Sequence, residues 1–276
     1  MIDLRDIASN LEPGPDGLWS PPRRSRVDYP DEGNAFCFQV EDASFWFRHR
    51  NACILEAVAR FPPAGAVFDI GGGNGFVARA LAAAGYPAVV VEPGPTGASN
   101  ARARGLSPVV CSTLDDAGFR AGSLPAAGLF DVLEHIEDDR GFLRRVWGLL
   151  QPGGRLYLTV PAYAWLWSAE DDLGGHHRRY TRRSLAEVAV EAGFDVDFST
   201  YFFWPLPLPI LLVRAIPSRL GHRPPADLDA IRRELKPPTG PAVRAIAALL
   251  DLERRWLARG GRVPMGGSCL LVAHRR

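Results

Sequence analysis

The fold is decided by one stretch of ten residues, Val67-Phe68-Asp69-Ile70-Gly71-Gly72-Gly73-Asn74-Gly75-Phe76. An apolar run ends here in a carboxylate and is followed at once by glycines. A segment with helical spacing comes next (77–85), and then a second apolar run, 89–91, which ends in Glu92. This order predicts a strand, a tight loop, a helix and a second strand, which is the unit that binds a nucleoside at the carboxyl edge of a parallel sheet.

The same alternation continues around this unit. Strands are expected at 66–70, 88–92, 108–111, 127–130, 155–160, 195–202 and 268–274, and helices at 76–84, 96–104, 138–150, 182–192 and 241–259. Strands that alternate with helices predict an α/β fold, a doubly wound and mostly parallel sheet. Loops are expected over 1–35 and one or two helices over 36–60.

Four segments are expected along the chain. They are an N-terminal extension with helices (1–60), a core (61–200), an apolar and basic insertion (201–267) and a final core strand (268–276). The insertion opens with an apolar run, 201–213, that holds three prolines. A transmembrane helix needs about 20 continuous apolar residues, so this run is a poor candidate. We interpret 201–216 as a lid, a peripheral membrane contact or a homodimer contact.

Composition excludes several classes of protein. The chain has 276 residues, 47% of them hydrophobic, and a net charge of +1, which argues against a nucleic-acid binder. From Tyr201 onward it holds 13 Lys/Arg and 5 Asp/Glu, against 19 and 26 before that point. The tail therefore carries about +8 and favours contact with an anionic surface or substrate, unless arginine is simply abundant.

The four cysteines are scattered and form no CxxC pair. This usage is typical of reduced thiols in a cytoplasmic protein, and no metal site is indicated. The N-terminus has no signal-peptide core.

The glycine loop allows two kinds of ligand. Its glycines let the backbone approach a ligand closely, and Glu92 can accept both hydroxyls of a ribose. Asp69 stands just before the loop and would repel a pyrophosphate, and Phe76 breaks the G-x-G-x-x-G pattern read from Gly71. Both features disfavour a nicotinamide-dependent oxidoreductase and favour a ligand with a cationic amino-acid head.

At these residues the chain resembles the class I S-adenosylmethionine-dependent methyltransferases, of a bacterial small-molecule type. The resemblance rests on Asp69, Gly71, Gly73 and Gly75, on Glu92, on 130–135 (FDVLEH) and on 149–154 (LLQPGG). It covers about residues 60–200 and a strand near 268–275. It implies a Rossmann-like seven-stranded sheet with an antiparallel last strand.

The resemblance also implies the roles of the cofactor-binding residues. The glycine loop of 71–75, with Gly71, Gly72 and Gly73, would cradle the methionine portion of S-adenosylmethionine. Asp69 would lie near its amino group and Glu92 would hold its ribose. The segment 111–114 would pack on adenine, with Leu114 as the apolar wall and Asp115 or Asp116 as an acidic neighbour. Phe130 and Asp131 would flank the sulfonium.

An amine or hydroxyl acceptor must lose a proton, and histidine is the usual base near neutral pH. His135 and His176 both follow strands at the ligand edge, so each is a candidate, although either can instead hold its loop. Arg178 and Arg179 can bind an anionic group of the acceptor or form a basic helix face with Thr181 as its N-cap. Trp46 can cover the acceptor or belong to the core. The pair 171–172, both Asp, can as easily be a solvated loop.

The sequence therefore predicts a methyltransferase that acts on oxygen or nitrogen of a small molecule, of lipid, sugar or secondary-metabolite type. A non-catalytic S-adenosylmethionine-binding partner protein is the first alternative, and an oxidoreductase is the second.

Overall fold

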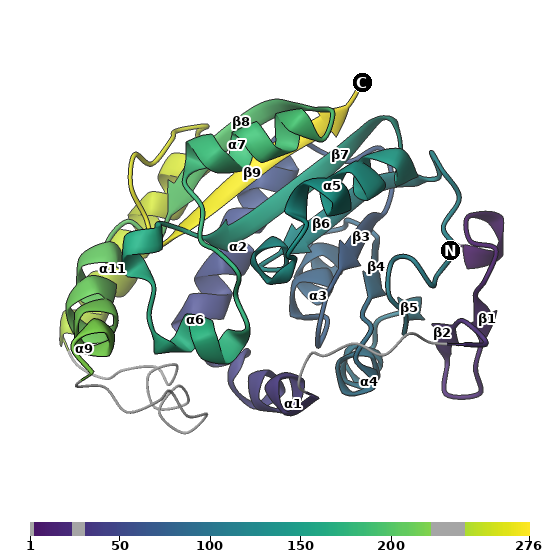
Figure 1. Cartoon of the computed structure of the whole chain (residues 1–276), viewed down its shortest axis with the longest axis horizontal. Coiled ribbons are helices and arrows are strands. Elements are labelled where there is room, and N and C mark those ends of the chain that lie inside the picture. The colour runs from purple at the N-terminus through teal and green to yellow at the C-terminus, as the bar shows by residue number, and fades with distance from the viewer. Residues whose placement is uncertain (1–2, 24–30, 222–240) are drawn as a thin grey trace.

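The computed structural model describes residues 3–23, 31–221 and 241–276. Over these residues one nine-stranded sheet runs through the molecule in the order β1-β2-β5-β4-β3-β6-β7-β9-β8 (Figure 1). The strands are β1 (Glu12–Pro13), β2 (Leu18–Ser20), β3 (Val67–Ile70), β4 (Ala88–Val91), β5 (Val109–Val110), β6 (Leu124–Phe130), β7 (Leu150–Pro161), β8 (Phe194–Phe202) and β9 (Ser268–Arg275).

The predicted fold class is confirmed. Strands β5, β4, β3, β6 and β7 are parallel, and β9 is antiparallel to both β7 and β8, between which it lies. The sheet exceeds the predicted seven strands because the N-terminal region, expected as loops, supplies β1 and β2. Strand β2 pairs in parallel with the two-residue strand β5 and buries Leu18. This pairing covers backbone groups that β5 would otherwise leave open at the edge of the sheet.

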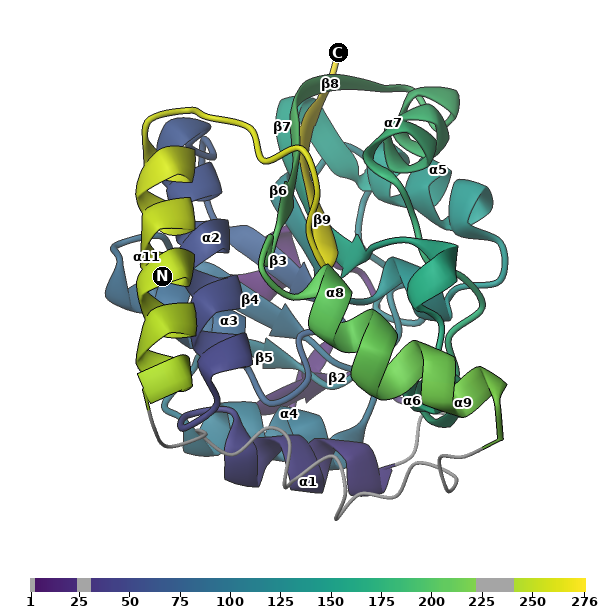
Figure 2. The same ribbon diagram turned by 90° about the vertical axis from the view of Figure 1, so that its left-hand side faces the viewer.

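Helices cover both faces of the sheet (Figure 2). Helices α2, α3 and α11 lie on one side, and α5 and α7 lie on the other. The helices are α1 (Asp31–Val40), α2 (Phe45–Arg60), α3 (Phe76–Ala83), α4 (Pro95–Ala103), α5 (Asp139–Leu149), α6 (Ala169–Gly174), α7 (Arg182–Glu191), α8 (Pro207–Ile210), α9 (Ile216–Arg219) and α11 (Pro241–Ala258). Short turns are η1 (Leu4–Asp6), η2 (Leu133–His135), η3 (Ala164–Leu166) and the π-helical η4 (Leu211–Ala215).

The central strands are apolar because both of their faces are covered. Every residue of β3 and of β4 is buried, as expected for parallel strands between two helical layers. The loop after β3 turns into α3 at Gly75, which has a φ of 72°. A Cβ there would lie 2.4 Å from Cδ1 of Leu106. Only glycine therefore allows this turn and this close packing.

The ligand edge is the carboxyl end of the parallel strands. The chain winds outward from β3 to β4 and β5, then returns to β6 and β7, so the strand order reverses beside β3. Asp131, Tyr163 and Phe203 follow β6, β7 and β8, and they have φ values of 58°, 59° and 62°. A non-glycine residue in this region costs about 1–3 kcal/mol, and such residues gather at functional sites.

The apolar run after β8 becomes helical in spite of its prolines. Segments α8, η4 and α9 follow one another, with Pro207 in the first turn of α8 where its missing N–H is tolerated. Large apolar side chains of this segment are exposed, among them Leu208, Leu212 and Leu220. Among the described residues, no helix combines the length and the apolar character needed to cross a bilayer.

Candidate functional site

The glycine loop and Glu92 form one hydrogen-bonded unit at the ends of β3 and β4. The Glu92 carboxylate accepts the backbone N–H of Gly73 and that of Gly94, both at 2.8 Å. Gly71 and Gly73 have positive φ values, and a Cβ on Gly72 would lie 2.9 Å from the Asp69 carbonyl oxygen. The predicted loop is thus a cradle of backbone closed by Glu92. A carboxylate can accept several hydrogen bonds at once, including those of a ligand hydroxyl.

Asp69 lies beneath this loop at the end of β3. Its side chain is 1% exposed, and Oδ2 has no hydrogen-bond partner. Burial raises its pKa to about 7, and the Glu92 charge adds to that shift while the Arg50 charge opposes it. An acid in this state favours a cationic partner, because the pairing would stabilise its charged form.

An asparagine of α1 closes the other side of the cradle. Asn34 is buried, and its Nδ2 has no hydrogen-bond partner. A Cβ on Gly97 would lie 2.8 Å from this nitrogen and 2.9 Å from Cγ of Glu92. The amide therefore stands beside Glu92, where the ribose of the expected cofactor would lie. The sequence analysis did not find Asn34, because no motif marks the N-terminal helix.

The segment expected to pack on adenine lies after β5. Leu114 is buried in the turn after β5. Asp115 is exposed and lies 3.4 Å from Arg145 of α5. Asp115 is therefore paired at the protein surface, and the roles of Leu114 and Asp116 beside adenine stay predictions.

Arg50 of α2 is a functional candidate that the sequence analysis missed. Its Nη1 lies 2.5 Å from Oδ2 of Asp131, and its side chain is 10% exposed. Asp131 also accepts the Thr159 hydroxyl at 3.0 Å. The Nε of Arg50 is buried without a partner, and its guanidinium lies 5.1 Å from the Trp46 ring. The sequence signal that could have identified Arg50 is an arginine on a helix face whose other residues are mainly apolar.

The two predicted histidines meet at the ligand edge. The rings of His135 and His176 lie 4.7 Å apart in a T-shaped arrangement. Burial and the neighbouring His176 lower the pKa of His135 to about 4, so His135 is neutral at pH 7. Nδ1 of His176 lies 2.8 Å from Oδ1 of Asp171. If Nδ1 carries the proton, this bond leaves Nε2 of His176 as a proton acceptor.

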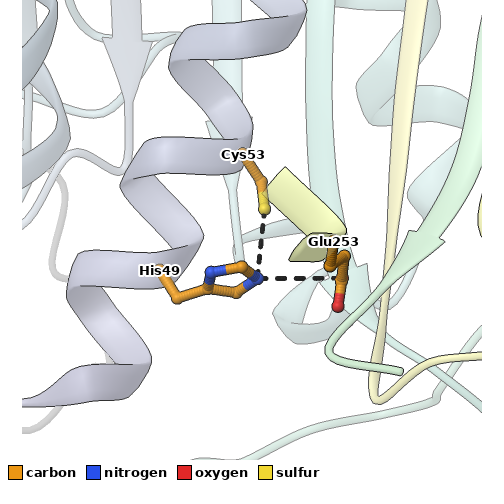
Figure 3. Close-up of side chains that lie close together, drawn as sticks. All are labelled: His49, Cys53 and Glu253. Carbon is orange, nitrogen blue, oxygen red and sulfur yellow. Dashed lines mark hydrogen bonds and ion pairs between the residues drawn. The ribbon is translucent and has the colours of Figure 1, made fainter. Parts of the chain in front are cut away.

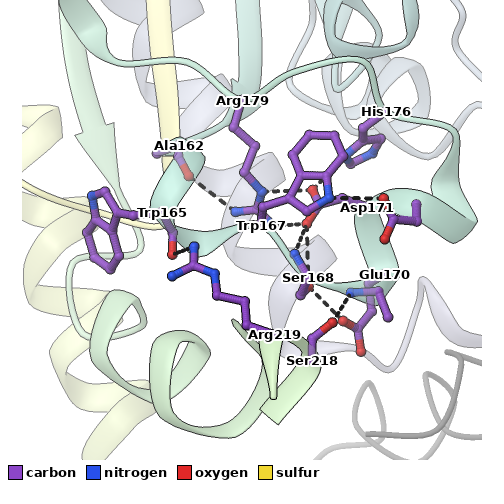
Figure 4. A network of polar contacts seen from close by, with 12 residues as sticks. Ala162, Trp165, Trp167, Ser168, Glu170, Asp171, His176, Arg179, Ser218 and Arg219 are labelled. Atoms are coloured by element: carbon purple, nitrogen blue, oxygen red, sulfur yellow. Dashed lines mark hydrogen bonds and ion pairs between the residues drawn. The ribbon is translucent and has the colours of Figure 1, made fainter. Parts of the chain in front are cut away.

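Asp171 is not in a solvated loop, which corrects one interpretation of the 171–172 pair. Its side chain is 1% exposed and accepts two hydrogen bonds from Arg179, at 2.7 and 2.9 Å (Figure 4). Burial raises its pKa, but the bonds from His176 and Arg179 outweigh burial and hold the pKa at about 2. Asp171 is the third residue of α6 and forms its capping box with Ser168, the N-cap.

Arg178 and Arg179 have protein partners. Arg179 also donates to the Ala162 carbonyl at 3.2 Å, and Arg178 contacts Asp139 at 2.9 Å and the Glu137 carbonyl at 2.6 Å. These contacts favour a role in holding the loop that carries His176. Thr181 is the N-cap of α7, as predicted.

Trp46 and Phe130 differ in position. Trp46 stacks on Phe203 at 5.4 Å and 9°, so it forms an aromatic wall at the ligand edge. The Phe130 ring is buried in the core and lines a small space with Ile54 and Tyr157. Phe130 is the last residue of β6, next to Asp131, and its place beside the sulfonium stays a prediction.

One acid of the site completes a group with metal-ligating atoms. Glu134, His135 and His176 each offer one ligand atom, and these atoms lie within 4.8 Å of one another. Glu134 is 1% exposed, and burial and the Asp131 charge raise its pKa well above the usual range.

The residues present fit the expected cofactor. Three buried polar atoms around the glycine cradle have no hydrogen-bond partner, namely Asp69 Oδ2, Asn34 Nδ2 and Arg50 Nε. They could meet a cationic amino group, a ribose and a carboxylate respectively. Buried polar atoms are rarely left unpaired, so this grouping favours a bound polar ligand.

Comparison with known proteins agrees with this geometry. A family model described as a methyltransferase domain matches residues 46–197. A ubiquinone biosynthesis O-methyltransferase of Xanthomonas axonopodis pv. citri is 35% identical over 118 residues, which are 40% of this chain and 49% of that protein. Its counterpart in Xanthomonas oryzae pv. oryzae is 33% identical over 109 residues, 37% of this chain and 46% of that one. The chain thus spans about half the length of the curated relatives it matches.

Solved structures share the fold at low identity. A putative methyltransferase, in complex with the Trm112 methyltransferase activator of Haloferax volcanii, has a TM-score of 0.58 and 19% identity, and the match covers 91% of this chain and 97% of that one. Phosphoethanolamine N-methyltransferase 2 of Haemonchus contortus, in complex with S-adenosyl-L-methionine, has a TM-score of 0.54 and 18% identity. That match covers 91% of this chain and 58% of the other.

Proposed function

The chain belongs to the methyltransferase-domain family, and from this premise we propose that it transfers a methyl group from S-adenosylmethionine to a hydroxyl oxygen of a small amphiphilic acceptor. Membership confirms the predicted class, the S-adenosylmethionine-dependent methyltransferases, and argues against a nicotinamide-dependent oxidoreductase. The acceptor and the methylated atom are our proposal.

The pair Asp171–His176 is the observation that carries the proposal. A hydroxyl is a poor nucleophile until its proton is removed, and a histidine held by a carboxylate can accept that proton. Asp171 is buried, ionised and fixed by Arg179, so it orients His176 and stabilises the imidazolium that forms. His135 stays neutral beside it and adds no competing positive charge.

The cofactor, when bound, supplies an electrophilic methyl group on its sulfonium. The residues of the chain supply position and a proton acceptor. Glu92 would hold the ribose of the cofactor and the glycine loop its methionine portion. Asp69 and Arg50 offer opposite charges to the amino and carboxyl groups of that portion. Trp46 and Phe203 exclude water from the edge where the acceptor would lie. Holding both reactants in one geometry can remove roughly 7–11 kcal/mol of the barrier.

The relatives support oxygen as the methylated atom and an apolar acceptor. They are named for O-methylation in ubiquinone biosynthesis. The aromatic wall and the exposed apolar segment after β8 would suit an acceptor that carries an apolar chain.

We also propose that this segment, predicted over 201–216, rests on an anionic membrane surface from which such an acceptor arrives. Leu208, Leu212, Ile216 and Leu220 are spaced by four residues and are all exposed. The sequence from 201 to 221 has no acidic residue. An apolar stripe without acids favours the membrane interface.

The same segment is hydrogen-bonded to the region between β7 and α7 that carries His176. Ser218 accepts the Ala169 N–H at 3.1 Å, and Arg219 donates to the Trp165 carbonyl at 2.7 Å (Figure 4).

The proposal is tested with methyl-labelled S-adenosylmethionine and pairs of aromatic acceptors that differ only in a hydroxyl or an amine, each with and without an alkyl chain. Labelled product from the chain-bearing hydroxyl acceptors is expected, and anionic vesicles should bind the protein more than neutral vesicles do. Methylation of the amines alone would contradict the proposed atom. Cofactor binding without turnover on any acceptor would favour the non-catalytic binding protein.

A cytoplasmic location, a homodimer and the absence of nucleic-acid binding stay predictions from the sequence.

A further inference from the structure

A second group of chemically reactive side chains lies away from the glycine cradle, between α2 and α11. His49 and Cys53 are four residues apart on α2 and share one face of that helix. Glu253 reaches them from α11. Figure 3 shows the three side chains pointing toward one another. The cysteine spacing indicated no metal site, since these residues come together only in the fold.

The geometry is that of metal ligands. Nε2 of His49 lies 3.3 Å from Sγ of Cys53 and 3.7 Å from Oε1 of Glu253, and the three ligand atoms lie within 4.8 Å of one another. A tetrahedral zinc ion with ligands at about 2.1 and 2.3 Å holds nitrogen and sulfur roughly 3.6 Å apart. A small adjustment of the side chains would therefore place all three atoms at ligand distance.

Two acceptor or donor atoms share one imidazole nitrogen in this group. Nε2 of a neutral imidazole makes one hydrogen bond, while both Sγ of Cys53 and Oε1 of Glu253 lie close to it. The three residues are 8%, 1% and 3% exposed, so the group is shielded from solvent. Among the described residues, His49 is the one ion-pair partner of Glu253. A divalent cation would neutralise the buried carboxylate.

The carboxylate is also held as metal-ligating carboxylates are. Glu253 accepts the backbone N–H of Phe203 at 2.6 Å and that of Trp204 at 3.0 Å. Such outer hydrogen bonds fix the orientation of a ligand before the ion binds. They also connect the group to the turn after β8, where Phe203 stacks on Trp46.

We infer that His49, Cys53 and Glu253 bind one divalent transition-metal ion of the zinc class, which joins α11 and the turn after β8 to α2. Nitrogen, thiolate sulfur and carboxylate oxygen are the donors that zinc takes in proteins, and a water is the expected fourth ligand. On binding, the Cys53 thiol releases its proton to solvent as the sulfur–metal bond forms. The ion would support the wall formed by Trp46 and Phe203 without contact with the reacting groups. The inference goes beyond the proposed methyl transfer and stands without it.

The test is to produce the full chain in minimal medium with cobalt in place of zinc. We expect about one cobalt per purified chain and a near-ultraviolet thiolate-to-cobalt charge-transfer band. Cys53→Ser should remove the band and lower the bound cobalt more than tenfold. Cys269→Ser is the matched control, because Cys269 is equally buried but lies outside this group, and it should keep both signals.

Three outcomes would overturn the inference: cobalt below about a tenth of an equivalent in the unchanged protein, cobalt without a thiolate band, or a band that survives Cys53→Ser. The second outcome would place the ion at a nitrogen and oxygen site such as Glu134, His135 and His176. If circular dichroism shows that Cys53→Ser does not fold, the inference is tested instead with a variant in which Cys53 is the one remaining cysteine (C37S/C111S/C269S). It must retain the band.

Discussion

Asp69 and Asp171 are both buried aspartates of the candidate site, and they differ in the partners that the protein gives them. Asp69, under the glycine loop, has an oxygen without a hydrogen bond and a pKa of about 7. Asp171, beside His176, accepts bonds from two basic side chains and has a pKa of about 2. Asp171 therefore has its charge partners within the protein, whereas the unpaired oxygen of Asp69 supports our proposal that this carboxylate pairs with a cationic group of the ligand.

The largest effect is expected when the proposed base beside Asp171, the His176 imidazole, is removed. His176→Ala should lower kcat by roughly 10²- to 10⁴-fold, because the acceptor proton loses its carrier. Cofactor affinity should not change, since the cradle keeps its contacts. The measurement is steady-state turnover on the best acceptor, with calorimetry for the cofactor. His177→Ala is the control, because that side chain is exposed, and its turnover should equal that of the parent. Equal activity of both variants would remove His176 as the base.

The Asp69 side depends on the closure of the loop by Glu92. Glu92→Ala should weaken cofactor binding, because the N–H groups of Gly73 and Gly94 lose their acceptor and each such loss costs about 1–3 kcal/mol. Isothermal titration with S-adenosylhomocysteine measures the change. Asp115→Ala, at the exposed acid paired with Arg145, should bind as the parent does. Equal affinities in the two variants would contradict the placement of the ligand.

The free energy of unfolding at acidic pH tests the ion pairs of Asp171. The folded-state pKa of Asp171 is depressed from the ordinary aspartate value of 3.8 to about 2. Its stabilisation is therefore complete above about pH 4 and is lost as the pH falls toward 2, with about 2 kcal/mol at stake. Urea unfolding at steps between pH 5 and 2 measures this. Asp171→Asn should lose less stability over the same interval. An identical slope in both proteins would show that Asp171 is not held by its ion pairs.

The smallest effect is expected at Arg178. Its donors are taken by Asp139 and the Glu137 carbonyl, so Arg178→Ala should change the acceptor KM less than about threefold. Acceptor kinetics over a range of concentrations give the value. A tenfold increase in KM with unchanged kcat would restore the acceptor-binding role that the sequence suggested for this residue.

The cofactor cradle and the acceptor side of the site differ in how far the sequence could predict them. The cradle was predictable because Asp69, the glycines and Glu92 follow one another along a strand, a loop and the next strand. The strand positions and the Thr181 cap were predictable for the same reason, since each depends on local pattern.

The acceptor side was predicted only in part. His135 and His176 could be placed at the ligand edge from the strands before them, but the bond between His176 and Asp171 depends on the path of α6. Arg50 and Asn34 come from N-terminal helices whose docking no local pattern encodes. The pairing of β2 with β5 was missed because two- and three-residue strands carry too little periodicity to be recognised.

The dependence of cofactor affinity on pH tests the central claim most directly. If Asp69 must be ionised to pair with the cationic group, affinity for S-adenosylhomocysteine should fall by roughly 25-fold between pH 7.5 and 5.5, where the ligand amino group stays protonated. Asp69→Asn should bind weakly and with little change over that range. A flat profile in the unchanged protein, or the same slope in Asp69→Asn, would show that Asp69 is not reserved for the ligand.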